Sequence, residues 1–166
     1  MALLPLLAGC YHGPLPPDTI SITSTEQPFR GIRFGQPPSD FPGVVQLQPA
    51  EYGVGLPEVT AYALPASSPL PVAQGPGRVT LIFFRRRLAR LLLHTNARTE
   101  SRALLAELGR AYGAAAPGAD SLAGGQRWAS STFGVDFVPD PRSAQADAWI
   151  VSNKLYWQED ASRIRH

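Results

Sequence analysis

The histidines of this 166-residue chain lie too far apart in the sequence to form a recognisable metal-binding motif. They are His12, His94 and His166. Zinc sites draw on histidine and cysteine at short spacings, such as HExxH or paired CxxC, and neither pattern occurs here. We therefore expect no metal site, and we assign His94, close to Arg90, to a solvated face of a strand.

Carboxylates and hydroxyls offer the next candidates for chemistry. Asp136, Asp140 and Asp147 fall within or beside the segment DFVPDPRSAQAD. Paired carboxylates can exchange protons in acid–base catalysis, but prolines and small polar residues between them are typical of a surface turn. Ser130 and Ser131 have no GxSxG context. The sequence carries no catalytic signature, and we expect a protein that is not an enzyme.

The one cysteine, Cys10, ends a short apolar run. This run is far shorter than the roughly 20 residues needed to cross a bilayer, but it suits the end of a secretory leader. The string Leu7-Ala8-Gly9-Cys10 resembles the lipobox of bacterial lipoprotein precursors. In that family the cysteine thiol receives a diacylglyceryl group, and the peptide is cut just before it. The resemblance implies a covalent lipid on Cys10 and no other cofactor.

The lipobox resemblance also implies a cellular location. It predicts a protein held in the cell envelope by its lipid, and Tyr11 in place of aspartate after the cysteine favours the outer membrane. No Lys or Arg precedes the apolar run, which a translation start further upstream would explain. The alternative is an N-terminal strand or helix with a buried free cysteine. Pro5 and Pro14 disfavour that alternative.

The charge of the chain gives little support to a nucleic-acid partner. The formal net charge is +2, and the pI near 9.0 reflects 14 arginines and the single lysine Lys154. Arginine in place of lysine, with abundant Ala, Gly and Pro, is typical of a GC-rich bacterial genome. A charge of +2 on this length is too small to indicate a polyanion partner. We expect no nucleic acid.

Proline divides the chain into parts. Fourteen of the 17 prolines precede residue 80, so the front half cannot be uniformly regular. We predict a signal-peptide remnant over 1–9, a lipid-anchored tether over 10–28, and one domain over 29–166 with proline-rich loops up to about residue 77. Short strands are predicted at three places within the first part of the domain: 29–34 with a bulge at Gly31, 43–47 and 59–64.

The most apolar segment, RVTLIFFRRRLARLLLHT at 78–95, has two interpretations. As a β-hairpin it turns at Arg85, Arg86 and Arg87, and its second arm places Ala89, Leu91 and Leu93 on one face. As an amphipathic helix it presents an apolar stripe beside a basic face. The arginines are poor turn formers, but the β-branched and aromatic first arm suits a strand. We favour the hairpin.

A helix over about 97–112 is the clearest predicted element. Asn96 is a good N-cap, Glu100 lies in the first turn, and Gly113 ends the helix in a left-handed conformation. Five residues form its predicted apolar stripe, and four form its outer face. The stripe is Leu104, Leu105, Leu108, Ala111 and Tyr112, and the outer face is Arg98, Arg102, Glu107 and Arg110.

Two further strands follow, at 127–138 with an interruption at Gly134 and at 148–156. The predicted fold is therefore α+β: a small antiparallel sheet with one main helix packed on it, preceded by a proline-rich extended region.

The aromatic residues near the C-terminus and the arginine triplet are the candidate binding residues. One of Trp128, Trp149 and Trp157 is expected to fill the core under the helix. The alternative is an aromatic and arginine groove for a partner, because Trp, Tyr and Arg dominate binding hot spots. The triplet at 85–87 is a solvated turn or a contact for anionic headgroups.

These observations favour a membrane-anchored binding or assembly subunit of a larger envelope complex, without enzymatic activity. Two alternatives stay open. One is an envelope hydrolase with an unrecognised site. The other is a cytosolic basic module that binds RNA or a membrane surface.

Overall fold

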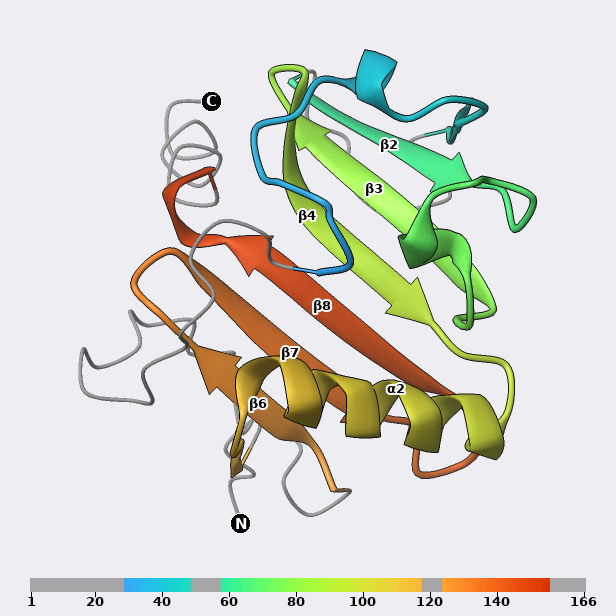
Figure 1. Cartoon of the computed structure of the whole chain (residues 1–166), viewed down its shortest axis with the longest axis vertical. Helices are drawn as coiled ribbons and strands as arrows, with labels where there is room; N and C mark the ends of the chain where they lie inside the picture. The colour runs from blue at the N-terminus through green and yellow to red at the C-terminus, as the bar shows by residue number, and fades with distance from the viewer. Residues whose placement is uncertain (1–28, 49–57, 118–123, 156–166) are drawn as a thin grey trace, which may run out of the picture.

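A single antiparallel sheet with one main helix on one face forms the domain (Figure 1). The computed structural model describes residues 29–48, 58–117 and 124–155. The predicted α+β class with one helix is confirmed. The predicted leader, Cys10 and the tether at 10–28 lie outside the described residues. No helix among the described residues has the length and apolar character needed to cross a membrane.

Eight strands and three helical segments with defined bounds make up most of the described part. Neighbouring strands in the sheet follow the order β1-β2-β3-β4-β8-β7-β6-β5, so the last strand returns to the middle beside β4. The strands are β1 (Val45–Gln46), β2 (Val59–Leu64), β3 (Arg78–Phe84), β4 (Arg87–His94), β5 (Ala116–Pro117), β6 (Gln126–Ala129), β7 (Phe133–Pro139) and β8 (Ala146–Ser152). The helical segments are η1 (Pro38–Asp40), η2 (Pro71–Ala73) and α2 (Arg98–Tyr112).

The predicted hairpin over 78–95 is confirmed as β3 and β4. Its pairing runs from Arg78 opposite His94 to Phe84 opposite Arg87, with a register shift after Ile82. Ala89 is the extra residue of this bulge, and it packs on the opposite face of the sheet from Leu91. The prediction that Ala89 shares a face with Leu91 and Leu93 is wrong, because a bulge reverses the alternation of side chains.

Strand β4 pairs with β3 along one edge, and its neighbour along the other edge changes at the bulge. Its residues from Arg90 to His94 pair with β8. Before the bulge, the Leu88 N–H donates to the Gln36 carbonyl and the Leu88 carbonyl accepts from the Gly35 N–H, both at 2.9 Å. At Leu88, where the pairing with β8 does not extend, the segment that contains Gly35 and Gln36 therefore lies next to β4. In Figure 1 this segment runs between the two halves of the sheet.

Helix α2 covers the half of the sheet formed by β6, β7 and β8 (Figure 1). It begins after Ala97, whose backbone is extended, so the prediction of Asn96 as N-cap is wrong by one residue. The Asn96 side chain lies against Gly77, leaving no room there for a Cβ atom. The Asn96 N–H instead donates to the Glu100 carboxylate at 2.7 Å, which confirms Glu100 in the first turn.

The end of α2 and its buried face largely match the prediction. Gly113 follows the helix with φ +83° and ψ −150°, so its φ is positive as predicted, but its ψ lies outside the left-handed helical region. Ala111 is exposed, contrary to prediction, whereas Ser101 in the first turn of α2 is buried. The Ser101 hydroxyl donates to backbone carbonyls of Ala97 and Ala144, which explains how a polar residue faces the sheet.

Irregular chain covers the other half of the same face. Phe29, Ile32, Phe41 and Val72 are buried there, and with the α2 side chains they form one continuous core. The Phe41 ring meets Phe83 of β3 edge-on at 5.8 Å between centroids. The sheet face that carries α2 and this irregular chain is called the covered face below.

The two strands predicted before residue 50 differ from the prediction: one is a turn, and the other is shorter than expected. The segment at 29–34 is a tight turn rather than a strand: Arg30 and Gly31 both have positive φ, and the Ile32 N–H donates to the Phe29 carbonyl at 2.9 Å. This turn buries both Phe29 and Ile32, which a strand alternation could not do. The strand predicted at 43–47 is reduced to β1, and that predicted at 59–64 is confirmed as β2.

The two strands predicted near the C-terminus correspond to three strands in the structure, β6, β7 and β8. The prediction at 127–138 covers the hairpin of β6 and β7, whose turn lies at residues 130–132 rather than at Gly134. The Ser130 hydroxyl accepts the N–H groups of Thr132 and Phe133 and so stabilises this turn. Strand β8 starts two residues before the predicted 148 and ends at Ser152, after which 153–155 are helical. Its residues alternate in burial, with Ile150 buried and its neighbours Trp149 and Val151 partly exposed.

Candidate functional site

The first candidate site is the arginine turn, defined as Arg85, Arg86 and Arg87 at the tip of the β3–β4 hairpin. A two-residue connection between antiparallel strands favours a turn with positive φ at both central positions. Arg85 and Arg86 occupy these positions with φ of 49° and 62°. Asn and Gly normally fill them, because other residues adopt this conformation at a cost of about 1–2 kcal/mol each. The turn is therefore strained and rich in cations.

The three arginines of this turn differ in their partners. Arg85 pairs with Glu58, with its Nε 2.9 Å and its terminal nitrogen 2.8 Å from Oε1, and its guanidinium lies 5.1 Å from the centroid of the Phe84 ring. Arg86 and Arg87 are exposed, and neither forms an ion pair within the part of the chain that the structure describes. Two cations of the turn thus have no carboxylate partner among the described residues.

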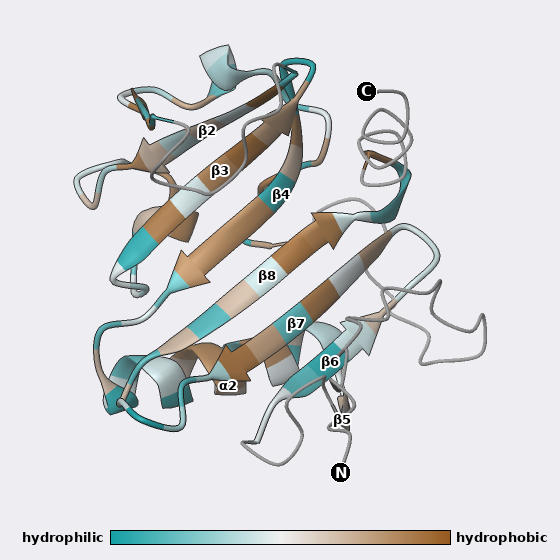
Figure 2. Cartoon of the chain, turned by 180° about the vertical axis from the view of Figure 1, so that it is seen from behind, coloured by the Kyte–Doolittle hydropathy of each residue, from teal (hydrophilic) through white to brown (hydrophobic). Residues whose placement is uncertain are grey.

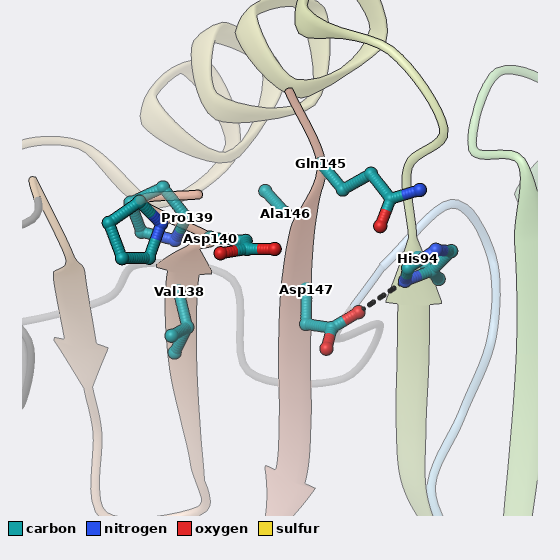
Figure 3. A pocket seen from close by; sticks show the side chains of 8 residues that line it. His94, Val138, Pro139, Asp140, Gln145, Ala146 and Asp147 are labelled. Atoms are coloured by element: carbon teal, nitrogen blue, oxygen red, sulfur yellow. Dashed lines mark hydrogen bonds and ion pairs between the residues drawn. The ribbon is translucent and has the colours of Figure 1, made fainter. Parts of the chain in front are cut away.

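The second candidate is a pocket of about 370 Å³ at the opposite end of β4 (Figure 3). It lies between the end of β4, the β7–β8 turn and the start of β8. His94 and Asp147 are paired across neighbouring strands, and the His94 Nδ1 lies 2.7 Å from an Asp147 carboxylate oxygen. The remaining lining residues are Val138, Pro139, Asp140, Pro141, Gln145 and Ala146.

Asp140 belongs to the β7–β8 turn that forms the wall of this pocket. Its carboxylate accepts the Arg142 N–H at 2.8 Å, and its own N–H donates to the Gln145 carbonyl at 3.0 Å. The hydrogen bond from the Arg142 backbone, followed by that of the Ser143 side chain, lowers the pKa of Asp140. The ionised carboxylate therefore accepts the hydrogen bonds that stabilise this turn.

An imidazole held by a carboxylate can act as a general base, so the His94 pair could take part in acid–base chemistry. However, no serine, threonine, cysteine, tyrosine or lysine is found among the described residues that line this pocket. The described pocket residues therefore offer a proton acceptor without a side-chain nucleophile. Sequence reasoning missed the pair because its members are 53 residues apart and meet only through the pairing of β4 with β8.

Of the tryptophans predicted as a binding group, the two described ones lie on opposite faces of the sheet: Trp128 lies under α2, and Trp149 lies on the face turned to the viewer in Figure 2. Trp128 is 1% exposed under α2, and its indole N–H donates to the Gly113 carbonyl at 2.9 Å. It is the tryptophan expected to fill the core, and its burial excludes it from partner binding. Trp149 is half-buried on the opposite face, where it stands beside Asp136 and Leu92. Trp157 lies outside the described residues.

Charged residues near these tryptophans have structural partners. The Arg127 Nε donates to Asp136 at 2.5 Å, between neighbouring strands. This pair places Asp136 in a cross-strand contact away from the His94 pocket. No cluster of three or more His, Cys, Asp or Glu side chains suited to a metal is found in residues 29–48, 58–117 and 124–155.

Comparison of the chain with protein-family models, with curated proteins and with solved structures finds no match.

Proposed function

We propose that this chain is a lipid-anchored protein of the bacterial cell envelope, with the outer membrane favoured, that acts as a non-enzymatic binding or assembly subunit of a larger envelope complex. The observation that carries the proposal is the string Leu7-Ala8-Gly9-Cys10 at the end of an apolar run. Small residues before the cysteine give a peptidase access to the bond that it cuts.

The spacing between the anchor and the domain supports this proposal. The nineteen residues at 10–28 separate Cys10 from Phe29, the first described residue. A chain of this length spans about 60 Å at full extension. The domain that follows has its own core, which extends under both α2 and the irregular cover. A domain of this kind can stay attached to a membrane anchor while it binds a partner.

Metabolic labelling tests the anchor. In a bacterial host, labelled palmitate should enter the wild-type chain and should not enter Cys10→Ser, because the thiol is the acceptor. Ala2→Ser, a small change outside the lipobox string, should be labelled like the wild type. Equal labelling of Cys10→Ser and wild type, or a soluble cytosolic pool in the native host, would overturn the proposal.

Purification in mild detergent tests the role as a subunit. The lipid-anchored chain should co-purify with a partner in constant stoichiometry. A solitary monomer with no partner would contradict a role in assembly.

The His94–Asp147 pair favours one second candidate, an envelope hydrolase in which the imidazole activates water. If the chain has such an activity, His94→Gln should abolish it, while Arg110→Gln on the exposed side of α2 should leave it unchanged. Loss of partner binding in His94→Gln without any hydrolytic activity in the wild type would instead assign the pocket to the binding function.

A further inference from the structure

We propose that the arginine turn is a second membrane contact, which binds the phosphate headgroups of the membrane that holds the Cys10 anchor. This inference rests on the proposed function for the identity of that membrane. The binding of headgroups by the turn can nevertheless be measured without the anchor.

The first support is the state of the charges at the turn. Glu58 compensates Arg85 and also packs against the hairpin, since the Arg85 N–H donates to the Glu58 carbonyl at 2.9 Å. Arg86 and Arg87 are left exposed to solvent without a carboxylate partner in the described structure. A guanidinium offers several N–H donors in a planar fork that matches phosphate oxygens. These two side chains are available for phosphate.

The second support is the position of another cation at this end of the sheet. Strand β8 runs antiparallel to β4, and Val151 lies opposite Arg90, so the chain after Ser152 continues toward the end where β4 begins. Lys154 is exposed there. Asp40, which accepts a hydrogen bond from the Gln36 side chain, keeps its negative charge, so the cations of this end outnumber it.

The third support is shape. The turn connects two long strands through two residues and lies at one end of the molecule, with its arginines exposed (Figure 1). A tight turn at such an end can touch a flat surface but cannot enclose a ligand. The phenylalanines that precede it, Phe83 and Phe84, are buried in the sheet and cannot insert into lipid. The contact is therefore electrostatic, and it should weaken strongly as salt screens the charges.

The strain of the turn supports a role for its side chains. Arg86→Gly would adopt the same backbone conformation without the cost of a left-handed arginine. Because this variant keeps the Arg85–Glu58 pair, it should fold at least as stably as the wild type and still bind more weakly. This variant separates the function of the turn from its contribution to folding.

Vesicle co-sedimentation of the full chain tests the inference, with Cys10→Ser in every protein so that no lipid anchor contributes. The parent should bind vesicles that contain about 30% anionic phospholipid at low salt and should not bind zwitterionic vesicles. Arg86→Gln/Arg87→Gln should bind about 30-fold more weakly, since each basic residue near the surface contributes about a factor of five. Binding should disappear at about 0.5 M salt.

Arg98→Gln/Arg102→Gln is the matched control, because it removes the same charge from the exposed side of α2. It should retain binding within about twofold of the parent. The inference is overturned if the parent does not bind anionic vesicles, if it binds both kinds of vesicle equally, or if the control loses as much binding as the turn variant. Palmitate labelling of the wild type reports separately on the anchor, so either proposal can fail alone.

Discussion

The covered face of the sheet is closed in two different ways. Over β6, β7 and β8 it is closed by α2, a regular helix of 15 residues. Over β2, β3 and β4 it is closed by the turn at Phe29, the segment up to Phe41, and η2. Burial is equally complete in the two halves, since Leu108 under the helix and Val72 under the irregular chain are both 0% exposed.

The two covers differ in where their backbone hydrogen bonds go. Within α2 nearly all of these bonds are internal to the helix, so the element needs the sheet only for its apolar stripe. The irregular cover has short turn bonds, such as Phe41 N–H to Pro38, and bonds to the sheet at Leu88. The irregular half therefore depends on the sheet for its shape, and we expect it to open first.

The largest expected effect on stability comes from removing Trp128, the core side chain under α2. Trp128→Ala should lower the free energy of unfolding by about 3–5 kcal/mol, because it leaves a large cavity and frees the carbonyl of Gly113. Urea denaturation measures this change. Trp149→Ala, in a half-buried position on the other face, should cost clearly less. Equal losses would contradict the placement of Trp128 as the core tryptophan.

The corresponding change in the irregular half is Phe41→Ala. It should cost about 3 kcal/mol, at the lower end of the range for phenylalanine, because a loop can collapse into the space left by the ring. Native-state hydrogen exchange should show faster opening at Leu88 while Val135 and Ile150 stay protected. Phe34→Ala, at a half-buried position on the same segment, should cost less. Uniform loss of protection across the sheet would show that the two halves open together.

The Arg30 side chain joins the two covers. Arg30 donates to the Pro71 carbonyl at 2.9 Å and pairs with the Glu107 carboxylate of α2, its Nε at 2.5 Å. Both side chains are about three-quarters shielded from solvent. A double-mutant cycle of Arg30→Gln and Glu107→Gln should give a coupling energy of about 1–2 kcal/mol. A coupling near zero would show that the halves are stabilised independently.

The smallest expected effect at neutral pH concerns Tyr112. Its buried hydroxyl has no hydrogen-bond partner among the described residues, and burial, with the nearby Glu107 charge, raises the pKa of Tyr112. Below pH about 10 the proton is present in both folded and unfolded chains; above it the unfolded chain loses the proton first, so stability falls.

Tyr112→Phe should therefore leave stability at pH 7 unchanged or slightly higher, since it removes an unpaired buried hydroxyl. It should also flatten the loss of stability between pH of about 10 and 11.5. Thermal unfolding at a series of pH values measures both effects. An alkaline slope identical to that of the wild type would contradict the burial of this hydroxyl.

Elements with a local signal could be predicted from the sequence, and the irregular cover could not. The helix at 98–112 and strand β2 follow from periodicity and residue type within the segment itself. The turn at Arg30 and Gly31 buries Phe29 and Ile32 against distant strands, so its conformation is decided by tertiary contacts. The bulge at Ala89 has the same origin, because it accompanies the change of partner along β4.

The candidate sites divide in the same way. The arginine turn follows from the hairpin pattern of one continuous segment, although its residues are unusual for such a turn. The His94–Asp147 pair depends on β8 returning to the middle of the sheet beside β4. No periodicity within either strand specifies its neighbour in space, so the pocket could be identified only from the assembled sheet.

The change of partner along β4 has a mechanical consequence. Tension applied through the chain before Phe29 would pass along the segment that reaches Gly35 and Gln36 before it reached the sheet. Among the described residues, the two backbone hydrogen bonds of Leu88 attach it to β4, Arg30 adds its bonds to η2 and α2, and Phe29, Ile32 and Phe41 pack in the core. Under load these few bonds would yield while the ladders of β3 with β4 and of β7 with β8 still held. The segment would then act as a release element that lengthens the connection without unfolding the sheet.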